Sequence, residues 1–202
     1  MSDNALKEQV QRLIDRQEIH DVIIAFARSV DRLDRDLYET TYHRDALDDH
    51  GVFVGGRADF YDWMEPVLRE QRHSTQHFMG NHTVEIDGDT AHAETYFITS
   101  SMTKQGKPFS MVGGRYIDQL VREDGRWSVL KRVLLTDWQL PLAADAFEQP
   151  DPAALGHFPP REQAMARARE LSRRDRQDIS YQRPLTISPA RLEISRKASE
   201  PA

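Results

Sequence analysis

The stretch HSTQHFMGNHTVEIDGDTAHAETYFITSSM, residues 73–102, decides the fold of this chain. Alternating apolar and polar residues lie on both sides of the turn DGDT at residues 87–90, which is typical of a β-hairpin. The pattern continues past the turn KQGKP into SMVGGRYIDQLVR, the turn EDGR and WSVLKRVLLTDWQ. The sequence therefore predicts consecutive antiparallel strands joined by short hairpins from residue 73 onwards.

Helical spacing precedes these strands. From Leu6 to Leu33 apolar residues recur every three or four positions, which indicates a long helix with one buried stripe. A short helix over Arg35–His43, a strand in ALDDHGVFVGG and a third helix in RADFYDWMEPVLREQR follow, with Pro66 marking a kink or a boundary. Three helices packed on a strongly curved antiparallel sheet predict an α+β cone with a pocket between the two layers.

The chain divides into two parts. Residues 1–142 form the predicted cone domain, and residues 143–202 form a C-terminal extension that begins with a stretch rich in Pro and Ala. The extension should contain one helix over about residues 160–177, followed by an extended tail. The apolar positions of this helix need a surface to cover, so we expect the extension to wrap its own subunit or a neighbouring one.

Composition limits the possible functions. The 202 residues contain no cysteine, which excludes disulfides, thiolate nucleophiles and sulfur-ligated metals. The sequence has no apolar run long enough to cross a bilayer, and its charged start is unlike a signal peptide, so we expect a cytoplasmic protein with no membrane partner. Residues 157–202 carry ten Arg and Lys against six Asp and Glu, so the net charge of −6 leaves about −10 for the preceding residues. An acidic body of this kind argues against nucleic-acid binding.

Asp31 is an unusual residue for its position. It follows Ile24 by seven residues and Ala27 by four, so a helix places its carboxylate on the buried stripe. A buried carboxylate is costly without a partner. One explanation is an ion pair with Arg28 on the same helix. The other is a hydrogen bond to a buried histidine.

His77 is the natural partner for Asp31. Strand alternation in TQHFM puts His77 and Met79 on one face, so this imidazole could point into the pocket. A carboxylate that accepts a hydrogen bond from one ring nitrogen leaves the other free to remove a proton, which is the arrangement of a general base. His77 could instead be structural, or could share a metal with His73, His82 and His50. That site would need a helix where the sequence predicts a strand, so we expect no metal.

Further candidates lie at alternating positions of the predicted strands. Asp48 and His50 share one face of the strand before the third helix. Polar or aromatic positions of the later strands that could line the same pocket are Tyr96, Tyr116, Arg132, Thr136 and Trp138. With Phe26 and Met79 as apolar walls, such a pocket would suit a flat, hydrophobic and aromatic ligand.

The chain resembles the SnoaL-like branch of the nuclear transport factor two-like superfamily. The resemblance covers about Leu6 to Leu142, and its carriers are FARSVDRLD, RDALDDHGVFVGG, the HSTQHFMGNHTVEIDGD block and GGRYIDQLVREDGRWSVLKRV. Members of this superfamily form α+β cones and often dimerise through the sheet. They include cofactor-independent lyases and isomerases, among them scytalone dehydratase, hexachlorocyclohexane dehydrochlorinase and the bile-acid dehydratases.

The resemblance implies roles for particular residues. An Asp at the end of the first helix orients a His on the strand after the third helix in the dehydratases and the dehydrochlorinase, and these positions match Asp31 and His77. Arg132 resembles an arginine of the dehydrochlorinase, and His50 falls where scytalone dehydratase presents a tyrosine to its substrate. Phe26 stands where bile-acid dehydratases carry a tyrosine, so the second polar catalyst of those enzymes is not carried over.

These observations give three functional hypotheses. The first is a cofactor-free lyase in which His77, Asp31 and His50 are catalytic and eliminate water, halide or a one-carbon unit such as formaldehyde from a bulky hydrophobic molecule. Such an enzyme would fit the breakdown of aromatic compounds and would be a homo-oligomer, a dimer or a trimer. The second is a ligand-binding or assembly subunit, similar to the small subunit of a ring-hydroxylating dioxygenase. The third is a steroid or polyketide isomerase.

Overall fold

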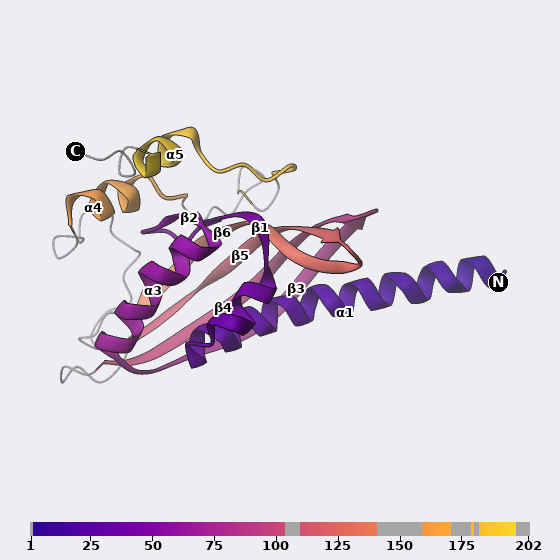
Figure 1. The fold of residues 1–202 in the computed structure, drawn as a ribbon, viewed down its shortest axis with the longest axis horizontal. Helices are drawn as coiled ribbons and strands as arrows, with labels where there is room; N and C mark the ends of the chain where they lie inside the picture. Colours follow the sequence, from indigo (N-terminus) through magenta and orange to yellow (C-terminus); the bar gives the residue numbers. More distant parts are fainter. Residues whose placement is uncertain (1, 104–109, 141–158, 171–178, 180–181, 197–202) are drawn as a thin grey trace.

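The computed structural model describes residues 2–103, 110–140, 159–170, 179 and 182–196 (Figure 1). The helices of this part of the chain are α1 (Asp3–Arg32), α2 (Arg35–Thr41), α3 (Arg57–Gln71), α4 (Pro160–Arg167) and α5 (Pro189–Arg196). Its strands are β1 (Tyr42–Asp49), β2 (Val54–Gly56), β3 (Arg72–Asp87), β4 (Thr90–Thr103), β5 (Ser110–Glu123) and β6 (Arg126–Leu140). The predicted turn KQGKP, the Pro- and Ala-rich stretch after Leu140 and residues 171–177 of the predicted tail helix lie outside the described residues.

The strands form one six-stranded sheet in the order β2-β1-β6-β5-β4-β3. From β3 to β6 each strand pairs antiparallel with the next, as the alternating pattern predicts. The turns that join them carry Gly88 (φ +56°) and Gly125 (φ +74°), where a residue without a side chain avoids steric strain. β1 pairs with β6 in parallel, so the prediction of a purely antiparallel sheet is wrong at this point. The long connection through α3 and the four strands β2 to β5 allows a parallel return.

Helix α1 packs against the sheet along its second half only. It begins where the Ser2 hydroxyl accepts a hydrogen bond from the Ala5 amide, and it ends at Leu33, which adopts a left-handed conformation. The predicted stripe is buried over the second half of the helix, at Ile19, Ile23, Phe26, Ala27 and Val30. The first half extends past the sheet (Figure 1). None of the helices in the described residues has the length and apolarity to cross a membrane.

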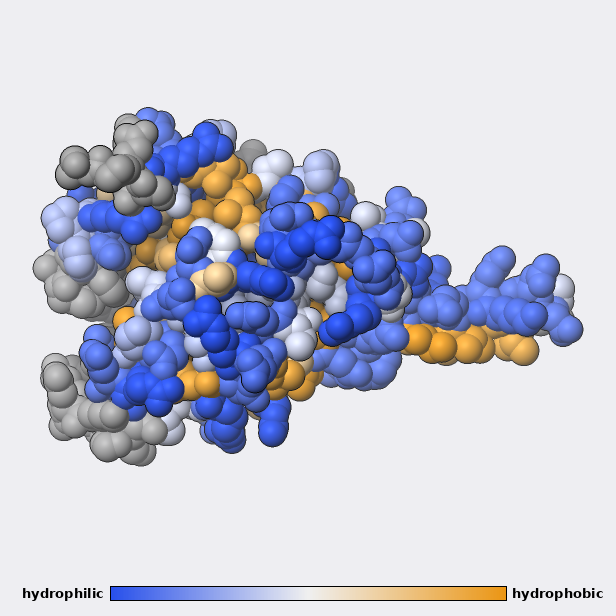
Figure 2. Space-filling model, in the orientation of Figure 1, coloured by the Kyte–Doolittle hydropathy of each residue, from blue (hydrophilic) through white to orange (hydrophobic). Residues whose placement is uncertain are grey.

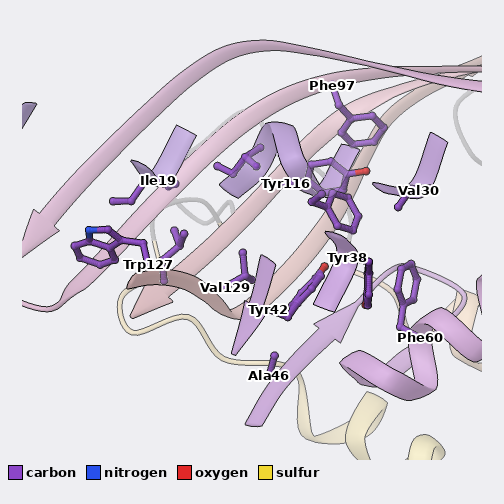
Figure 3. Packing of buried hydrophobic residues seen from close by; sticks show 14 of the residues in the cluster. Ile19, Val30, Tyr38, Tyr42, Ala46, Phe60, Phe97, Tyr116, Trp127 and Val129 are labelled. Atoms are coloured by element: carbon purple, nitrogen blue, oxygen red, sulfur yellow. The ribbon is translucent and has the colours of Figure 1, made fainter. Parts of the chain in front are cut away.

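The sheet has a buried core on each face. The inner core lies between the sheet and helices α1 to α3, and Figure 3 shows Tyr38, Tyr42, Phe60, Phe97 and Tyr116 within it. The outer core lies between the sheet and the C-terminal segment. It consists of Val54, Ile117, Val133, Leu135, Met165, Ile179, Leu185 and Ile187. The alternation of side chains explains why neighbours such as Tyr116 and Ile117 belong to different cores.

The C-terminal segment differs from its predicted form. Helix α4 ends at Arg167, and residues 189–196, expected to be extended, form helix α5. Pro189 is the first residue of α5, a position that proline favours because its fixed φ suits the first helical turn and no amide hydrogen is needed there. Both helices lie at the end of the sheet that is remote from the free end of α1 (Figure 1). The described part of the extension therefore packs on the outer face of the sheet.

Candidate active site

Asp31 and His77 form a close hydrogen-bonded pair inside the cone. The Asp31 Oδ1 atom lies 2.7 Å from His77 Nδ1, and the backbone amide of His77 donates to Asp31 Oδ2 at 2.9 Å. The side chains are 12% and 8% exposed, so both are largely shielded from water. Because Nδ1 faces a carboxylate, the neutral ring carries its proton on Nδ1 and presents Nε2 as a base.

The positions of both residues explain why they meet. Asp31 lies in the last turn of α1, where the negative end of the helix dipole disfavours another negative charge. β3 is an edge strand of the described sheet, so amides on its open side have no strand partner. The contacts with the His77 ring and amide therefore stabilise the Asp31 carboxylate at the end of the helix and give the open amide of β3 a hydrogen-bond acceptor. The alternative ion pair between Asp31 and Arg28 is not the contact that this carboxylate makes.

A second Asp–His pair lies at the end of β1. Asp48 Oδ1 is 3.1 Å from His50 Nδ1, and the ring of His50 packs on Phe60 with 4.5 Å between ring centroids. Asp48 is completely buried, whereas the His50 side chain is 18% exposed. The hydrogen bond to Asp48 therefore orients the His50 ring, and Nε2 is the ring atom left available to a substrate.

Asp48 belongs to a buried polar network. Its Oδ2 atom accepts a short hydrogen bond from the Tyr42 hydroxyl, and that hydroxyl accepts one from Arg132 at 3.3 Å. Arg132 makes two further bonds of 2.7 Å to the Asp118 carboxylate. Its guanidinium also lies between the rings of Phe26 and Tyr116, 4.1 and 4.3 Å from their centroids. Arg132 thus links Asp118, Tyr42 and the two aromatic rings into one buried network. Asp48, which orients His50, belongs to this network.

Tyr116 lies within the electrostatic influence of both pairs. Burial raises the pKa of its phenol, Arg132 lowers it, and the carboxylates of Asp48, Asp118 and Asp31 raise it. The ring stacks on Phe97 with a centroid distance of 4.5 Å. The phenol therefore stays protonated at neutral pH and can donate a hydrogen bond to an oxygen atom of a ligand.

The structure brings most of the predicted site residues to the inner face of the sheet. Met79 lies two residues along β3 from His77 and packs on the inner core, and Phe26 lies at its centre. Thr136 pairs with Gly114 on the same face as Leu134. Asp48 and Arg132 are both completely buried, so they support the neighbouring side chains and are not themselves accessible to a ligand.

Tyr96 and Trp138 do not lie on the inner face of the sheet, which corrects their predicted place in the pocket lining. In β4, Thr99 is the residue paired with His77, so Phe97 points inward and Tyr96 points outward with 46% of its surface exposed. In β6, Gly113 pairs with Trp138 while Gly114 pairs with Thr136, which leaves Asp137 as a bulge. This extra residue moves Trp138 to the outer face, where it lines a pocket of about 290 Å³ together with Tyr96 and Phe78.

Three residues of the site, Asp118, Phe97 and Tyr42, are not among the residues predicted from the sequence. Asp118 is the cross-strand neighbour of Arg132, and its position two residues after Tyr116 in an alternating strand was a usable signal. Phe97 could have been found from the same alternation in β4. Tyr42 had no comparable signal, because its contact with Asp48 depends on the path of β1.

The histidines do not form a metal site in the described part of the chain. No group of three or more His, Asp or Glu side chains there has an arrangement that could hold a metal ion. His82, which was considered as a ligand, instead bonds to Thr95 at 2.8 Å. His50 and His77 each direct one ring nitrogen to a carboxylate, as groups used in acid–base chemistry do.

Two histidines, each oriented by a carboxylate, lie on the inner face of this α+β cone. Such an arrangement is typical of a site for a small molecule. A model of the SnoaL-like domain family matches residues 11–133. This match covers more than half of the chain, so the chain belongs to the SnoaL-like family. An uncharacterised protein of Mycobacterium tuberculosis is 26% identical over 128 residues, which make up 61% of this chain and 86% of that protein.

Solved structures share the fold. Hexachlorocyclohexane dehydrochlorinase LinA type 3 from Novosphingobium barchaimii superposes with a TM-score of 0.61 at 21% identity, over 70% of this chain and 99% of that one. A protein of Novosphingobium aromaticivorans, provisionally described as a scytalone dehydratase, gives 0.61 at 17% identity, over 70% and 96% of the two chains. These similarities confirm the cone fold.

Proposed function

We propose that this chain is a cofactor-independent lyase in which His77 is the general base. The observation that carries the proposal is the contact between Asp31 and His77: one carboxylate gives both oxygens to one histidine, in a largely buried setting. This arrangement fixes the ring in a single orientation and leaves Nε2 free to accept a proton. Membership of the SnoaL-like family supports an activity of the lyase or isomerase type.

The proposed reaction is an elimination. His77 Nε2 takes a proton from a carbon atom of the substrate, and the electron pair of the broken C–H bond forms a double bond to the adjacent carbon. The leaving group departs from that carbon with its bonding electrons. Positioned acid–base catalysis contributes about 10²–10⁴-fold, and the remaining acceleration comes from holding the substrate in a site that excludes water.

His50 and Tyr116 suit the other end of the reaction. A leaving hydroxyl needs a proton, which His50 can supply, whereas a leaving halide does not. Formaldehyde would leave after a hydroxyl proton is removed: the C–C bond breaks as the C=O bond forms, and the electron pair of the C–C bond forms the double bond as the leaving group departs from the adjacent carbon. The aromatic walls from Phe26, Phe60 and Phe97 favour a bulky hydrophobic substrate, aromatic or polycyclic, of the kind met in aromatic compound catabolism.

The free half of α1 supports a homo-oligomer as part of the proposal. Leu6, Val10, Leu13 and Ile14 are between 44% and 66% exposed. They form an apolar stripe on the helix where it extends past the sheet (Figure 2). An apolar stripe of this kind is typical of a surface that meets another subunit. Light scattering on the purified protein should give the mass of a dimer or a trimer, and a monomer would contradict this part of the proposal.

Proton abstraction can be tested before the substrate is known. Small molecules retained by the purified protein, followed by a panel of hydrophobic compounds with hydroxyl or halide leaving groups, are incubated with the protein in D₂O. We expect products that lack the elements of water or hydrogen halide, and deuterium in unreacted substrate where proton removal is reversible. His77→Gln should lose both signals while retaining the fold and the bound compound.

Other outcomes separate the rival functions. A product of unchanged mass with deuterium incorporated would identify an isomerase. Retention of a ligand with no chemistry, unaffected by His77→Gln, together with co-purification of a larger metal-containing chain, would identify an assembly subunit. His50→Gln adds a further distinction, because turnover should fall for hydroxyl leaving groups and remain for halides.

A further inference from the structure

Arg191 of helix α5 approaches the candidate active site from the outer face of the sheet. Its side chain is completely buried, and its Nε atom lies 2.5 Å from the Asp49 carboxylate in an ion pair. One terminal nitrogen donates to the carbonyl oxygen of Gly51 at 2.6 Å, and the other donates to that of Met165 in α4 at 2.5 Å. Asp49 and Gly51 are the residues immediately before and after His50. The guanidinium therefore holds both chain neighbours of this histidine.

The segment around His50 needs such support. Gly51 has a φ of +80°, a left-handed conformation that glycine adopts readily and that leaves the local backbone free to move. The internal hydrogen bonds of the turn run from the Gly51 amide to Asp49 Oδ1 at 3.2 Å, from the His50 amide to the Phe53 carbonyl at 2.8 Å and from the Val52 amide to the His50 carbonyl at 3.0 Å. The direction of the His50 ring depends on how this short turn is held.

Helix α5 is itself fixed to the sheet. Leu192 and Ile194 pack against the outer core, and the Ser195 hydroxyl donates to the carbonyl oxygen of Val54 at 2.8 Å. Val54 begins β2, on the other side of the turn that carries His50. The C-terminal segment thus contacts the residues on both sides of this turn, Asp49 through Arg191 and Val54 through Ser195.

The energetics of the ion pair favour a geometric role. Burial raises the pKa of Asp49 to about 6 although the Arg191 guanidinium lowers it. The desolvation cost of the carboxylate is therefore not fully offset by its partner. A buried ion pair of this kind is weak evidence for stability, and fixing a unique local geometry is the best-attested use of such pairs.

We propose that Arg191 is a positioning residue for His50, through which the C-terminal extension sets the direction of the imidazole inside the cone. Three features carry this inference: the guanidinium contacts both neighbours of His50, it is completely buried, and its helix is anchored to both strands around the turn. The inference rests on the proposed participation of His50 in the active site. It assigns to residues far along the chain a role in the geometry of that site.

The test follows the ring of His50 directly. The full chain is prepared with histidine labelled by ¹³C at Cε1, and the His50 and His77 signals are identified by their loss in His50→Gln and His77→Gln. In Arg191→Met we expect the His50 signal to shift and to broaden or divide, and its titration midpoint to change, while the His77 signal stays in place. Lys131→Met is the matched control, because Lys131 bonds to the tail carbonyl of Leu185 away from this turn. It should leave both signals unchanged.

Two further variants keep the test decisive if Arg191→Met fails to fold. Arg191→Lys retains the charge and loses the forked contacts to the two carbonyl groups, so the His50 signal should shift part of the way. Asp49→Asn should disturb His50 in the same sense. A His50 signal identical to the wild type in these folded variants would overturn the proposal, as would equal disturbance of His50 and His77. Because the readout is a ring signal and not a product, it stands whether or not the elimination reaction is found.

Discussion

The two Asp–His pairs of this protein are built in different ways. Asp31 and His77 are 46 residues apart and meet because a helix end lies against the open edge of a strand. Asp48 and His50 are two residues apart, at the end of β1 and in the turn that follows it, and their geometry depends on buried charges on both faces of the sheet. The first pair therefore depends on the packing of one helix. The second depends on the integrity of a charged core, so damage to each pair should be recognisable by a different measurement.

The largest effect is expected at the first pair. Asp31→Asn removes the charge that orients His77 while keeping an oxygen that can accept a hydrogen bond. Turnover of a substrate that undergoes elimination should fall by about 10²–10⁴-fold, which is the contribution of positioned acid–base catalysis. The free energy of unfolding, measured in urea, should change little. Near-normal turnover in this variant would contradict the proposed catalytic role of the Asp31–His77 pair and with it the contrast between the two pairs.

The second pair should respond mainly in stability. Arg132→Met leaves the Asp118 carboxylate buried without its partner, so the free energy of unfolding should fall by about 3–5 kcal/mol. Arg44→Met, at an exposed ion pair with Glu123, is the matched control and should cost less than about 1 kcal/mol. Replacing Arg132 and Asp118 together by Met and Leu should recover much of the loss. A loss no larger than the control would mean that the network does not support His50.

The pH dependence of stability should reveal Asp49. Since its pKa is raised from 3.8 to about 6, the folded state binds this proton more tightly than the unfolded state. Its stabilising contribution is complete below pH 3.8 and is lost as the pH rises through about 6. Relative to Asp49→Asn, the wild type should therefore lose up to about 3 kcal/mol over this window and remain constant above it. Urea unfolding at a series of pH values measures the difference, and a gain with rising pH would reverse the assignment.

The smallest effect is expected outside the cone. Tyr96→Ala changes an exposed residue on the outer face of the sheet, so turnover should be unchanged and the free energy of unfolding should shift by less than about 0.5 kcal/mol. Steady-state kinetics and urea unfolding provide the check. A large loss of turnover would show that the outer face takes part in the reaction.

The sequence could predict the first pair because both of its members follow regular periods. Asp31 continues the helical stripe of α1, and His77 occupies an inward position of an alternating strand. The resemblance to the SnoaL-like family then joined them, and the structure confirms their contact. The order of helices and strands followed from the same two periods.

The rest depended on events that break these periods. A single bulge at Asp137 turned Trp138 to the other face, and no local residue pattern announces such a bulge. The parallel pairing of β1 with β6 depends on the path of the whole chain, and the contact of Tyr42 with Asp48 depends on the register shift within β1. Helix α5 falls in a stretch predicted to be extended, although Pro189 is a good first residue of a helix and was a usable signal.

The position of Asp31 on the open edge of β3 has a consequence for how the protein behaves in solution. An edge strand invites further strands to pair with it, and proteins often protect such edges with a charge placed against the backbone. The Asp31 carboxylate occupies the free amide of His77, so an incoming strand would meet a negative charge and an occupied donor. Beyond its proposed role in orienting a catalytic base, Asp31 thus protects this edge of the sheet against pairing with further strands.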